Sequence, residues 1–510
     1  MNPIIKMMMG TFCSHLLGFL RDVILFAVLG SSLETSAFLV AFLIPNLFRR
    51  LCGEGALTTA FIPVFSERLQ QQPQTAHHFL SCFFSRFGVA LGSFCITFGV
   101  LLAIGHHYFT DEKTNLVLRL TIIMLPFLWF VCTAALYNGA LNVCNAFFLT
   151  AFSSTALNLS LLCGLGLCSL FHLYPILSVM TLSVCVVVGG WFQWFLPKKQ
   201  LQRKGFRPAF RWAQDPDVTH VWQLFLPSVV GAVLFQINNC LGQFLSYVID
   251  APRTGYLCLA GRFVNLPFAL FSVSVFSVLF PKLSLAFSQN NHHASYALLH
   301  RSLQLSLLLL FPSTIGLFVF AQPFLSLCFQ WGKFSWLDIQ YTIPLMKLYT
   351  LQLPFSGVIA LLNRVFYSYQ EVQTPVRNTA WTLLVHLLSC GCFIPFYGIL
   401  GIPMGTLLSS VFQFTLQIVE LRKKYPELRI HRNLFTSFPW IGLGIYSFLL
   451  WMLYKNIPWS SEKGSTLLWL SGAILLGTAS YIGMLWFFDR KGLHLLRQMQ
   501  IDLPEQSSQA

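Results

Sequence analysis

Charged side chains inside apolar stretches are the residues of this sequence that could do chemistry. Arg21 and Asp22 are adjacent within the first apolar stretch, and Arg262 lies inside a later one. A charge at the centre of a bilayer costs at least about 2.5–3.5 kcal/mol on insertion scales, so ionisable groups at that depth usually line a pathway. Acidic partners inside the apolar stretches are few, with Asp22 the clear one, so a cavity that these groups share is expected to be cationic.

Arginine gives such a cavity a preference for phosphate. Its planar fork of donors matches phosphate oxygens, and the pairing is stronger in a partly dehydrated site. A cavity with several arginines and one or two carboxylates is therefore expected to bind a diphosphate better than an organic cation. The alternative is that the charges form structural pairs or reach the membrane surface on their long stems. That alternative applies first to Arg119, Lys347 and Arg364.

Neutral polar side chains at membrane depth complete the candidate binding site. Ser14 and His15 stand about two helical turns before Arg21. Later apolar stretches contain Asn158, Gln236, Asn238 and Asn239. Such groups either contact a polar solute or join helices through hydrogen bonds, and the residue types leave both interpretations open.

The sequence carries no motif of an enzyme or a metal protein. It has no G-x-x-x-x-G-K-[ST] phosphate loop, no paired carboxylates in a loop that could act on a sugar, and no C-x-x-C among its 14 cysteines. Adjacent histidines such as His106 and His107 lie in a predicted loop, where a solvated histidine is the simpler interpretation. We expect no catalytic residue, no metal site and no cofactor.

The composition places these residues in a membrane protein. The chain has 510 residues, of which 55% are hydrophobic and 10% charged, whereas soluble proteins are roughly 25% charged. It lacks the polar residues to cover a surface in water. The net charge of +15 then indicates the excess of cations in cytoplasmic loops that membrane proteins show, and we expect no nucleic-acid partner.

Fourteen apolar stretches are long enough to cross a bilayer, which takes about 20 residues each. Each must be a helix, because a lone strand cannot satisfy its backbone hydrogen bonds in hydrocarbon. The predicted spans are 3–30, 32–50, 79–105, 114–137, 145–172, 173–196, 217–249, 255–280, 295–320, 338–365, 376–394, 396–420, 436–454 and 465–489.

The loops predict the orientation. Clusters of lysine and arginine follow the sixth and twelfth spans, at 198–211 and 422–432, and the tail adds three more cations. The opposite loops hold only scattered cations. This asymmetry puts both termini and the basic loops in the cytoplasm. The number of spans must then be even, which favours fourteen over thirteen.

The two basic connections also divide the chain into lobes. We predict a six-helix lobe at 1–197, a basic linker at 198–216, a second six-helix lobe at 217–421, a helix pair at 422–489 and a cytoplasmic tail at 490–510. A weak repeat supports this division, because Phe61–Ser66 resembles Leu279–Ser284 at a corresponding place. Two parallel repeats related by an axis along the membrane normal are one known transporter architecture.

No segment between the spans is long enough for a separate domain. The longest connections lie near 51–78, 197–216 and 281–294. Gln70–His78 is rich in Pro, Gln and His and is expected to be loop. Whatever the protein does is therefore expected to take place within the bilayer.

One long pattern in the first 70 residues is specific. Leu17–Asp22 reads L-G-F-L-R-D, Ala37–Phe42 reads A-F-L-V-A-F, and Pro45–Ala56 contains P-N-L-F-R-R-L and E-G-A. This pattern resembles the signature of the MurJ/MviN family. Later segments agree with it, at Phe329–Phe334 and Phe366–Ser368.

The resemblance implies the fold of the multidrug/oligosaccharidyl-lipid/polysaccharide exporters, in which two six-helix lobes enclose a central cavity and the last two helices form a groove for a lipid tail. It implies lipid II as the substrate, an undecaprenyl diphosphate bearing a disaccharide-pentapeptide. Arg21, Arg49 and Arg262 would bind the diphosphate, and Asp22 and Glu54 would shape the site and gate. Arg50 follows Arg49 in the Arg-Arg pair of the motif and would lie beside this site. The alternative for Arg49, Arg50 and Glu54 is anchoring at lipid headgroups.

Four positions depart from the family pattern. Ser36 stands where the family often has Asp, and His15 where many members have Arg; Gly261 and Asn265 flank Arg262 where acidic residues are common. These departures remove carboxylates, so the cavity becomes more basic and the coupling ion stays unassigned. The membrane potential is the expected source of energy.

The expected mechanism is alternating access, with the diphosphate held by the cavity and the polyprenyl tail left in lipid. Two rivals share the fold, a flippase for another polyprenyl-linked oligosaccharide and a multidrug or cation antiporter. A membrane glycosyltransferase would need a periplasmic catalytic loop, which the sequence lacks, and a non-transporting scaffold would not need the buried arginines. Expected partners are lipid II and membrane lipids, and other proteins of cell-wall synthesis or division are candidates.

Overall fold

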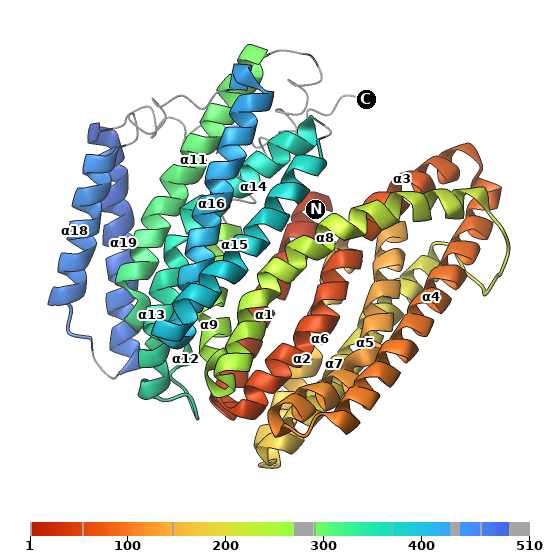
Figure 1. Ribbon diagram of the computed structural model, residues 1–510, viewed down its shortest axis with the longest axis horizontal. Helices are drawn as coiled ribbons and strands as arrows, with labels where there is room; N and C mark the ends of the chain where they lie inside the picture. Colours follow the sequence, from red (N-terminus) through yellow and green to blue (C-terminus); the bar gives the residue numbers. More distant parts are fainter. Residues whose placement is uncertain are drawn as a thin grey trace. The chain divides into compact units, whose positions relative to one another are not determined.

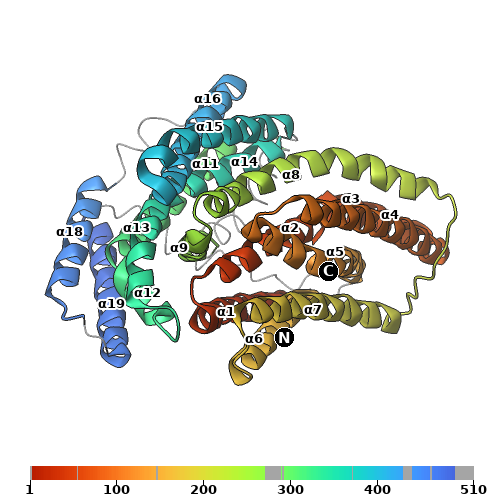
Figure 2. The ribbon, with the colours of Figure 1, turned by 60° about the horizontal axis from the view of Figure 1, so that its bottom comes forward.

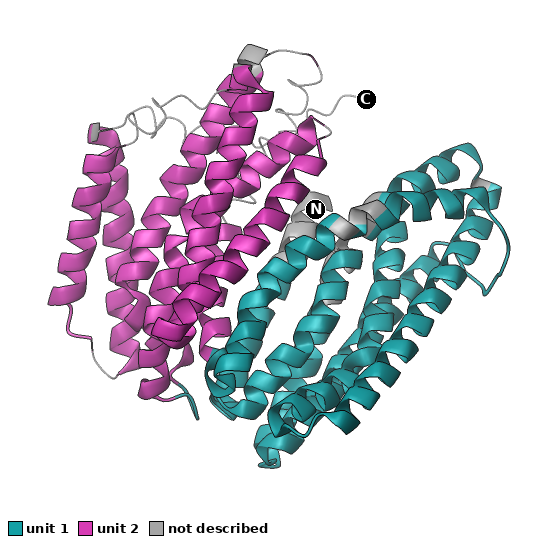
Figure 3. Cartoon of the chain, in the orientation of Figure 1, with its two compact units in different colours: residues 1–255, 331–334 teal, residues 256–330, 335–510 magenta. Residues whose placement is uncertain are grey.

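The chain is helical throughout its described part. The computed structural model describes residues 3–53, 56–144, 147–269, 289, 292–369, 371–428, 439–459 and 462–488. Every regular element in those ranges is a helix (Figure 1), which confirms the predicted all-α fold class. The helices form two compact units, Met1–Gly255 with Trp331–Phe334, and Tyr256–Gln330 with Ser335–Ala510 (Figure 3).

Unit 1 is a bundle of long helices. Its α5 packs against α7, α2 and α4, while α1 packs against α6, and α8 packs against α3 and α2; Figure 2 shows α1 beside α6 and α7 from a second side. The helices are α1 Pro3–Leu29, α2 Leu33–Gly53, α3 Ala56–Gln71, α4 Pro73–Tyr108, α5 Glu112–Val143, α6 Phe147–Leu170, α7 Pro175–Arg203 and α8 Pro216–Ile249.

The predicted loop at Gln70–His78 is wrong, because the end of helix α3 and the first turn of α4 occupy it, and α3 makes much of the connection at 51–78 helical. Phe61 and Phe65 lie one turn apart on α3 and stack on Phe79 and Phe83 of α4, with ring centroids 5.3–6.4 Å apart. All four rings are at most 1% exposed. Pro73 sits in the first turn of α4, where its missing N–H costs nothing. A composition of Pro, Gln and His therefore fits a helix start as well as a loop.

Unit 2 contains shorter and broken helices. Its α15 and α16 form an antiparallel pair, and α18 packs against α19 and α11. The helices are α9 Thr254–Pro267, α11 His292–Val319, α12 Ala321–Phe329, α13 Trp336–Leu351, α14 Leu353–Ser368, α15 Gln373–Tyr397, α16 Gly401–Lys424, α18 Trp440–Asn456 and α19 Lys463–Phe488. Pro354 begins α14, and the predicted single span 338–365 is bent there by 40°.

The predicted number of fourteen spans is not confirmed. In the described part of the chain, eight helices are long and apolar enough to cross a membrane, or nine if the bent pair α13–α14 counts as one span. The stretch Gln373–Lys424 counts once although it contains both α15 and α16, and the apolar helix Thr155–Leu170 falls short of the required length. The count of fourteen therefore stays a prediction.

The predicted lobe boundaries stay a prediction. They rest on an internal repeat, whereas the two compact units are groups of helices that pack together, and α8 packs within unit 1. Of the two repeat segments, Leu279–Ser284 lies outside the described residues, as does the predicted tail at 490–510.

A short clasp, Trp331–Phe334, closes the end of α1 in unit 1. The Lys333 N–H donates to the Ala27 carbonyl at 2.8 Å, and Phe334 packs edge-on against Phe26 at 5.4 Å. Carbonyls in the last turn of a helix have no partner in the helix, so this bond satisfies one of them. Gly332 has φ +56°, and a Cβ built there would overlap the Ala27 carbonyl oxygen.

Gly332→Ala tests this close approach. Gly332 needs both a positive φ and the space of a missing side chain, so the alanine should lower the thermal-unfolding midpoint of the purified protein by several degrees, corresponding to roughly 1–3 kcal/mol. Gly398→Ala is the matched control, because Gly398 has φ +55° with nothing within 4 Å of its position. An equal loss in both variants would contradict a role for the clasp contact.

Candidate functional site

Arg21 forms the centre of a polar network in unit 1. Its Nη2 and Nε donate to Asp22 Oδ1 at 2.6 and 3.0 Å, and its Nη1 donates to Asn158 Oδ1 at 3.0 Å. The side chains of Arg21 and Asp22 are 13% and 9% exposed, and Asn158 is 8% exposed. The guanidinium is thus held by one carboxylate and one amide in an otherwise apolar helix pair.

Close packing of α1 on α6 places this network. A Cβ built on Gly18 would lie 3.5 Å from Asn158 Nδ2, an ordinary van der Waals distance, so the amide lies directly against α1 at this position. Asn158 Nδ2 donates to the Ser14 carbonyl at 3.1 Å, one turn before Gly18. The amide therefore bridges the backbone of α1 and the guanidinium of Arg21.

Ser14 and His15 differ in their surroundings. Ser14 is half-buried and joins the network through its backbone carbonyl, while His15 is exposed. The sequence placed both beside Arg21, and the structure brings only Ser14 into hydrogen-bond contact with Asn158. Of the neutral candidates, Asn158 is the one that the fold brings to the arginine.

Arg49 and Arg50 end α2 in unit 1 and are half-buried. Arg49 Nε donates to Asn46 Oδ1 at 3.0 Å, one turn earlier on the same helix. Asn46 belongs to the P-N-L-F-R-R segment, so the asparagine of that motif orients its arginine. Glu54 lies outside the described residues, and its predicted role stays a prediction.

Gln236 and Asn239 lie on α8 of unit 1. The Gln236 Oε1 atom is buried and has no hydrogen-bond partner among the described residues, whereas Asn239 is exposed. A buried amide oxygen without a partner costs about 1–3 kcal/mol. Gln236 therefore carries more weight as a ligand-binding candidate than Asn239.

Arg262 belongs to unit 2. It lies on α9 with its side chain exposed, beside an exposed Asn265, and a Cβ on Gly261 would meet nothing within 4 Å. The surroundings of Arg262 are therefore open and hold no crowded packing. A cavity shared by Arg21, Arg49 and Arg262 stays a prediction.

Comparison with known proteins identifies the family. The family model described as "Lipid II flippase MurJ" matches residues 25–485. The chain belongs to the lipid II flippase MurJ family. It is 28% identical over 506 residues to the probable lipid II flippase MurJ of Bdellovibrio bacteriovorus, which covers 96% of this chain and 95% of the relative. It is 27% identical over 509 residues to the lipid II flippase MurJ of Burkholderia cenocepacia, with 96% and 97% covered.

Solved structures agree on the fold of this MurJ family member. A lipid II flippase MurJ in an inward closed conformation superposes with a TM-score of 0.79 at 23% identity, over 96% of this chain and 99% of that one. An inward-facing multidrug resistance MATE transporter gives a TM-score of 0.62 at 12% identity, over 85% and 100%. The MurJ and MATE transporters therefore share this architecture.

Ser36, a departure from the MurJ family pattern, is fully buried at the start of α2. Its Oγ donates to the Pro252 carbonyl at 3.4 Å, and Ser31 Oγ donates to the same carbonyl at 2.8 Å. Two hydroxyls thus contact the short 3-10 turn Ala251–Arg253 that follows α8, Ser31 closely and Ser36 at a longer distance. A neutral donor suits a carbonyl, which explains how this chain tolerates the missing carboxylate.

The remaining charges in the spans have local partners. Arg119 is exposed and its Nε donates to His106 Nε2 at 3.1 Å. Lys347 lies 5.2 Å from the Phe318 ring centroid. These contacts fit a structural role for Arg119 and Lys347. For Arg364, on α14, the choice between a structural and a binding role stays open.

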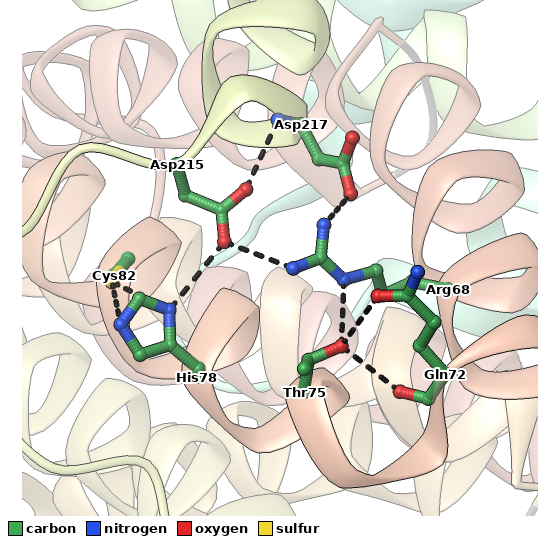
Figure 4. A network of polar contacts seen from close by, with 7 residues as sticks. All are labelled: Arg68, Gln72, Thr75, His78, Cys82, Asp215 and Asp217. Atoms are coloured by element: carbon green, nitrogen blue, oxygen red, sulfur yellow. Dashed lines mark hydrogen bonds and ion pairs between the residues drawn. The ribbon is translucent and has the colours of Figure 1, made fainter.

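A second polar network in unit 1 was not predicted from the sequence (Figure 4). Arg68 of α3 pairs with Asp217 through Nη1 and with Asp215 through Nη2 at 3.4 Å, and its Nε donates to Thr75 at 3.1 Å. His78 Nδ1 of α4 lies 3.5 Å from the same Asp215 carboxylate. The sequence signal was the Asp-Pro-Asp run in a basic linker, where the Asp215 side chain caps the start of α8. The network ties that helix start to α3 and α4.

The described residues contain no group of three or more His, Cys, Asp or Glu side chains that could hold a metal ion. The Arg21 network itself offers one carboxylate, one amide oxygen and a cation, a set that suits an anion better than a metal.

Arg21→Ala tests how strongly the pair depends on both members. Removing one partner of a buried ion pair leaves the other charge uncompensated at a cost of about 3–5 kcal/mol, whereas removing both can be close to neutral. Arg21→Ala should therefore lower the thermal-unfolding midpoint more than Arg21→Ala/Asp22→Ala. The exposed pair Arg253–Asp250 supplies matched control variants, which should stay within about a degree of wild type because exposed pairs contribute little. A double variant less stable than Arg21→Ala would contradict this account.

Proposed function

We propose that this protein moves lipid II from the cytoplasmic to the periplasmic leaflet of the bacterial inner membrane, as a transporter without a chemical step. Membership of the MurJ family supports the proposal, and the relatives from Bdellovibrio bacteriovorus and Burkholderia cenocepacia carry that activity in their names. The observation that carries the mechanism is a nearly buried Arg21 bound to Asp22 and Asn158.

Arg21 would capture the diphosphate of the substrate. A guanidinium has five N–H groups, and three hydrogen bonds join Arg21 to Asp22 and Asn158. The other two N–H groups can donate to phosphate oxygens. Asp22 lowers the cost of keeping Arg21 at depth when no substrate is bound, and a diphosphate can replace part of its interaction. The carboxylate therefore serves as a resident substitute for the anion.

The other cations would bind the substrate in sequence. Arg49 and Arg50 at the end of α2 would attract the headgroup from the cytoplasmic side, with Glu54 as part of the gate. Arg262 would join Arg21 at the diphosphate in the central cavity. The polyprenyl tail would stay in lipid beside α18 and α19, so that only the polar headgroup crosses.

Alternating access would complete the transport cycle. The lobes would rock about the bound headgroup and expose it to the periplasm, with both chain termini staying in the cytoplasm. A potential that is negative inside favours outward movement of an anion by about 2.3 kcal/mol per charge per 100 mV. The same potential would draw the unloaded arginines back inward, and the proposed cycle needs no cofactor.

A multidrug or cation antiporter is the rival of the same fold, since a MATE transporter superposes at a TM-score of 0.62. Binding an organic cation would need unpaired carboxylates at depth. Asp22 already accepts two hydrogen bonds from Arg21, so it is not available in that role. A flippase for another polyprenyl-linked oligosaccharide would use the same phosphate chemistry.

Arg21→Ala and Arg262→Ala should each reduce the appearance of lipid II in the outer leaflet at least about tenfold. Charge-assisted hydrogen bonds contribute about 1.5–3 kcal/mol each, and a tenfold change corresponds to 1.4 kcal/mol. The measurement supplies each variant to bacteria depleted of their own flippase and labels lipid II that is accessible from the periplasm.

Arg119→Ala is the control, because Arg119 is exposed and its guanidinium bonds to His106, which lies in the last turn of α4 and not in the predicted loop. It should support flipping at the wild-type rate. Normal flipping by Arg21→Ala or Arg262→Ala at wild-type expression would refute capture by charge. If the wild-type protein is inserted and stable but lipid II stays inside, the substrate is another lipid-linked sugar or a cation.

A further inference from the structure

The linker between α7 and α8 is a built element held against α4 within unit 1. The Ala209 N–H donates to Ser81 Oγ at 3.2 Å, and the Arg211 N–H donates to Ser85 Oγ at 2.8 Å. Ser81 and Ser85 are one turn apart on α4, so alternate backbone amides of an extended segment bind one face of the helix. We call residues 203–212 the linker strap.

Both ends of the strap are anchored. At one end Phe206 stacks on His77 at 4.5 Å and packs edge-on against Phe65 at 6.0 Å. Beyond the other end, Asp215 joins the network with Arg68 and His78 (Figure 4). The strap therefore presents its remaining side chains from a fixed backbone.

The strap runs along α4 toward the membrane. Phe206 lies at the level of His77, and Trp212 lies at the level of Arg86, whose guanidinium is 5.9 Å from the indole centroid. The predicted span of α4 begins near residue 79, so Phe206 and Trp212 lie beside the first turns of that span. The loop that descends beside α4 can be followed in Figure 1. The boundary between headgroups and acyl chains is expected near the end of a span.

Its exposed side chains are aromatic and cationic. Phe210 is 76% exposed and Trp212 is 63% exposed, although neither belongs to a spanning helix. The turns of α4 that carry the strap are themselves largely buried, with Ser81 and Ser85 each 7% exposed, so the exposed aromatic surface here belongs to the strap. Aromatic rings near the end of a membrane span favour the interface between lipid and water.

Seven cations belong to the strap or to the helices that flank it: Arg86 of α4 lies 5.9 Å from the Trp212 ring centroid, and the end of α7 and the strap carry Lys198, Lys199, Arg203, Lys204, Arg207 and Arg211. None of them has an ion pair in the described part of the chain, and the two nearby carboxylates, Asp215 and Asp217, are engaged with Arg68. Lys198 lies 4.1 Å from the Trp194 ring centroid at the end of α7. The patch is therefore uncompensated, and a ligand that complements it must be anionic and able to accommodate aromatic rings beside its charge.

We propose that the linker strap binds the headgroups of anionic phospholipids in the leaflet at the basic end of the protein, with Phe210 and Trp212 seated among the acyl chains. Each Lys or Arg near an anionic surface adds attraction, and the rings supply depth. This site is separate from the Arg21 network, so the proposal does not depend on the transported substrate.

The test measures contact between Trp212 and lipid in vesicles that contain the full-length protein. The vesicles carry a fixed fraction of acyl-brominated phosphatidylglycerol or, in the parallel set, acyl-brominated phosphatidylcholine, and bromine quenches nearby indoles. The share of quenching that is lost in Trp212→Phe belongs to Trp212. That share should be at least about twofold larger with the anionic lipid, and high salt should reduce the difference because it screens charge.

Charge variants assign the preference to the strap. Arg207→Gln/Arg211→Gln should bring the two lipids to equal quenching, while Arg207→Lys/Arg211→Lys should keep the preference. Arg422→Gln/Lys423→Gln removes the same charge from another basic loop and should also keep it. An unquenched Trp212, equal quenching by both lipids in the wild type, or a preference that survives Arg207→Gln/Arg211→Gln would overturn the proposal.

Discussion

A guanidinium kept at depth in an apolar helix bundle is the constraint on which the rest of the structure depends. Arg21 is 13% exposed and bonds to Asp22 and Asn158. Without those partners its charge would be expelled, neutralised or hydrated. Where α1 packs on α6, Asn158 bonds to both the Arg21 side chain and the α1 backbone. The same contact that stabilises the resting protein leaves part of the guanidinium able to bind an anion.

Apart from the Arg21–Asp22 pair, the protein has both close-packed regions and loosely packed ones. The stacked rings of α3 and α4 and the clasp on α1 are close-packed, whereas Arg262 and Gly261 lie in open surroundings. Close packing transmits movement, because packed helices shift as bodies and do not deform locally. The proposed alternating access would use both properties. The Arg68 network adds a rigid connection at the start of α8, next to a strap that meets lipid.

Much of the helical layout could be predicted from the sequence. Apolar length fixes where a helix must run, because the bilayer leaves no other way to satisfy the backbone. Helix α3 was missed because its buried face, with Phe61 and Phe65, is short and lies between polar residues. The bend at Pro354 was missed because the mean hydropathy of the whole stretch does not reveal a break within it. Asn158 was found as a polar residue at depth, but only packing showed that it binds Arg21. The network of Arg68, His78 and Asp215 joins residues more than 130 positions apart, and no local pattern predicts such a meeting.

The most direct test of the central claim is the binding of lipid II to the purified protein, measured against undecaprenyl phosphate, which keeps the tail but has one phosphate and no sugar. Native mass spectrometry of the protein in a neutral detergent can count both lipids on the same sample. The account predicts a preference for lipid II that is lost in Arg21→Ala and kept in Arg119→Ala. An unchanged preference in Arg21→Ala would contradict it, because recognition of the headgroup would then not depend on the buried arginine.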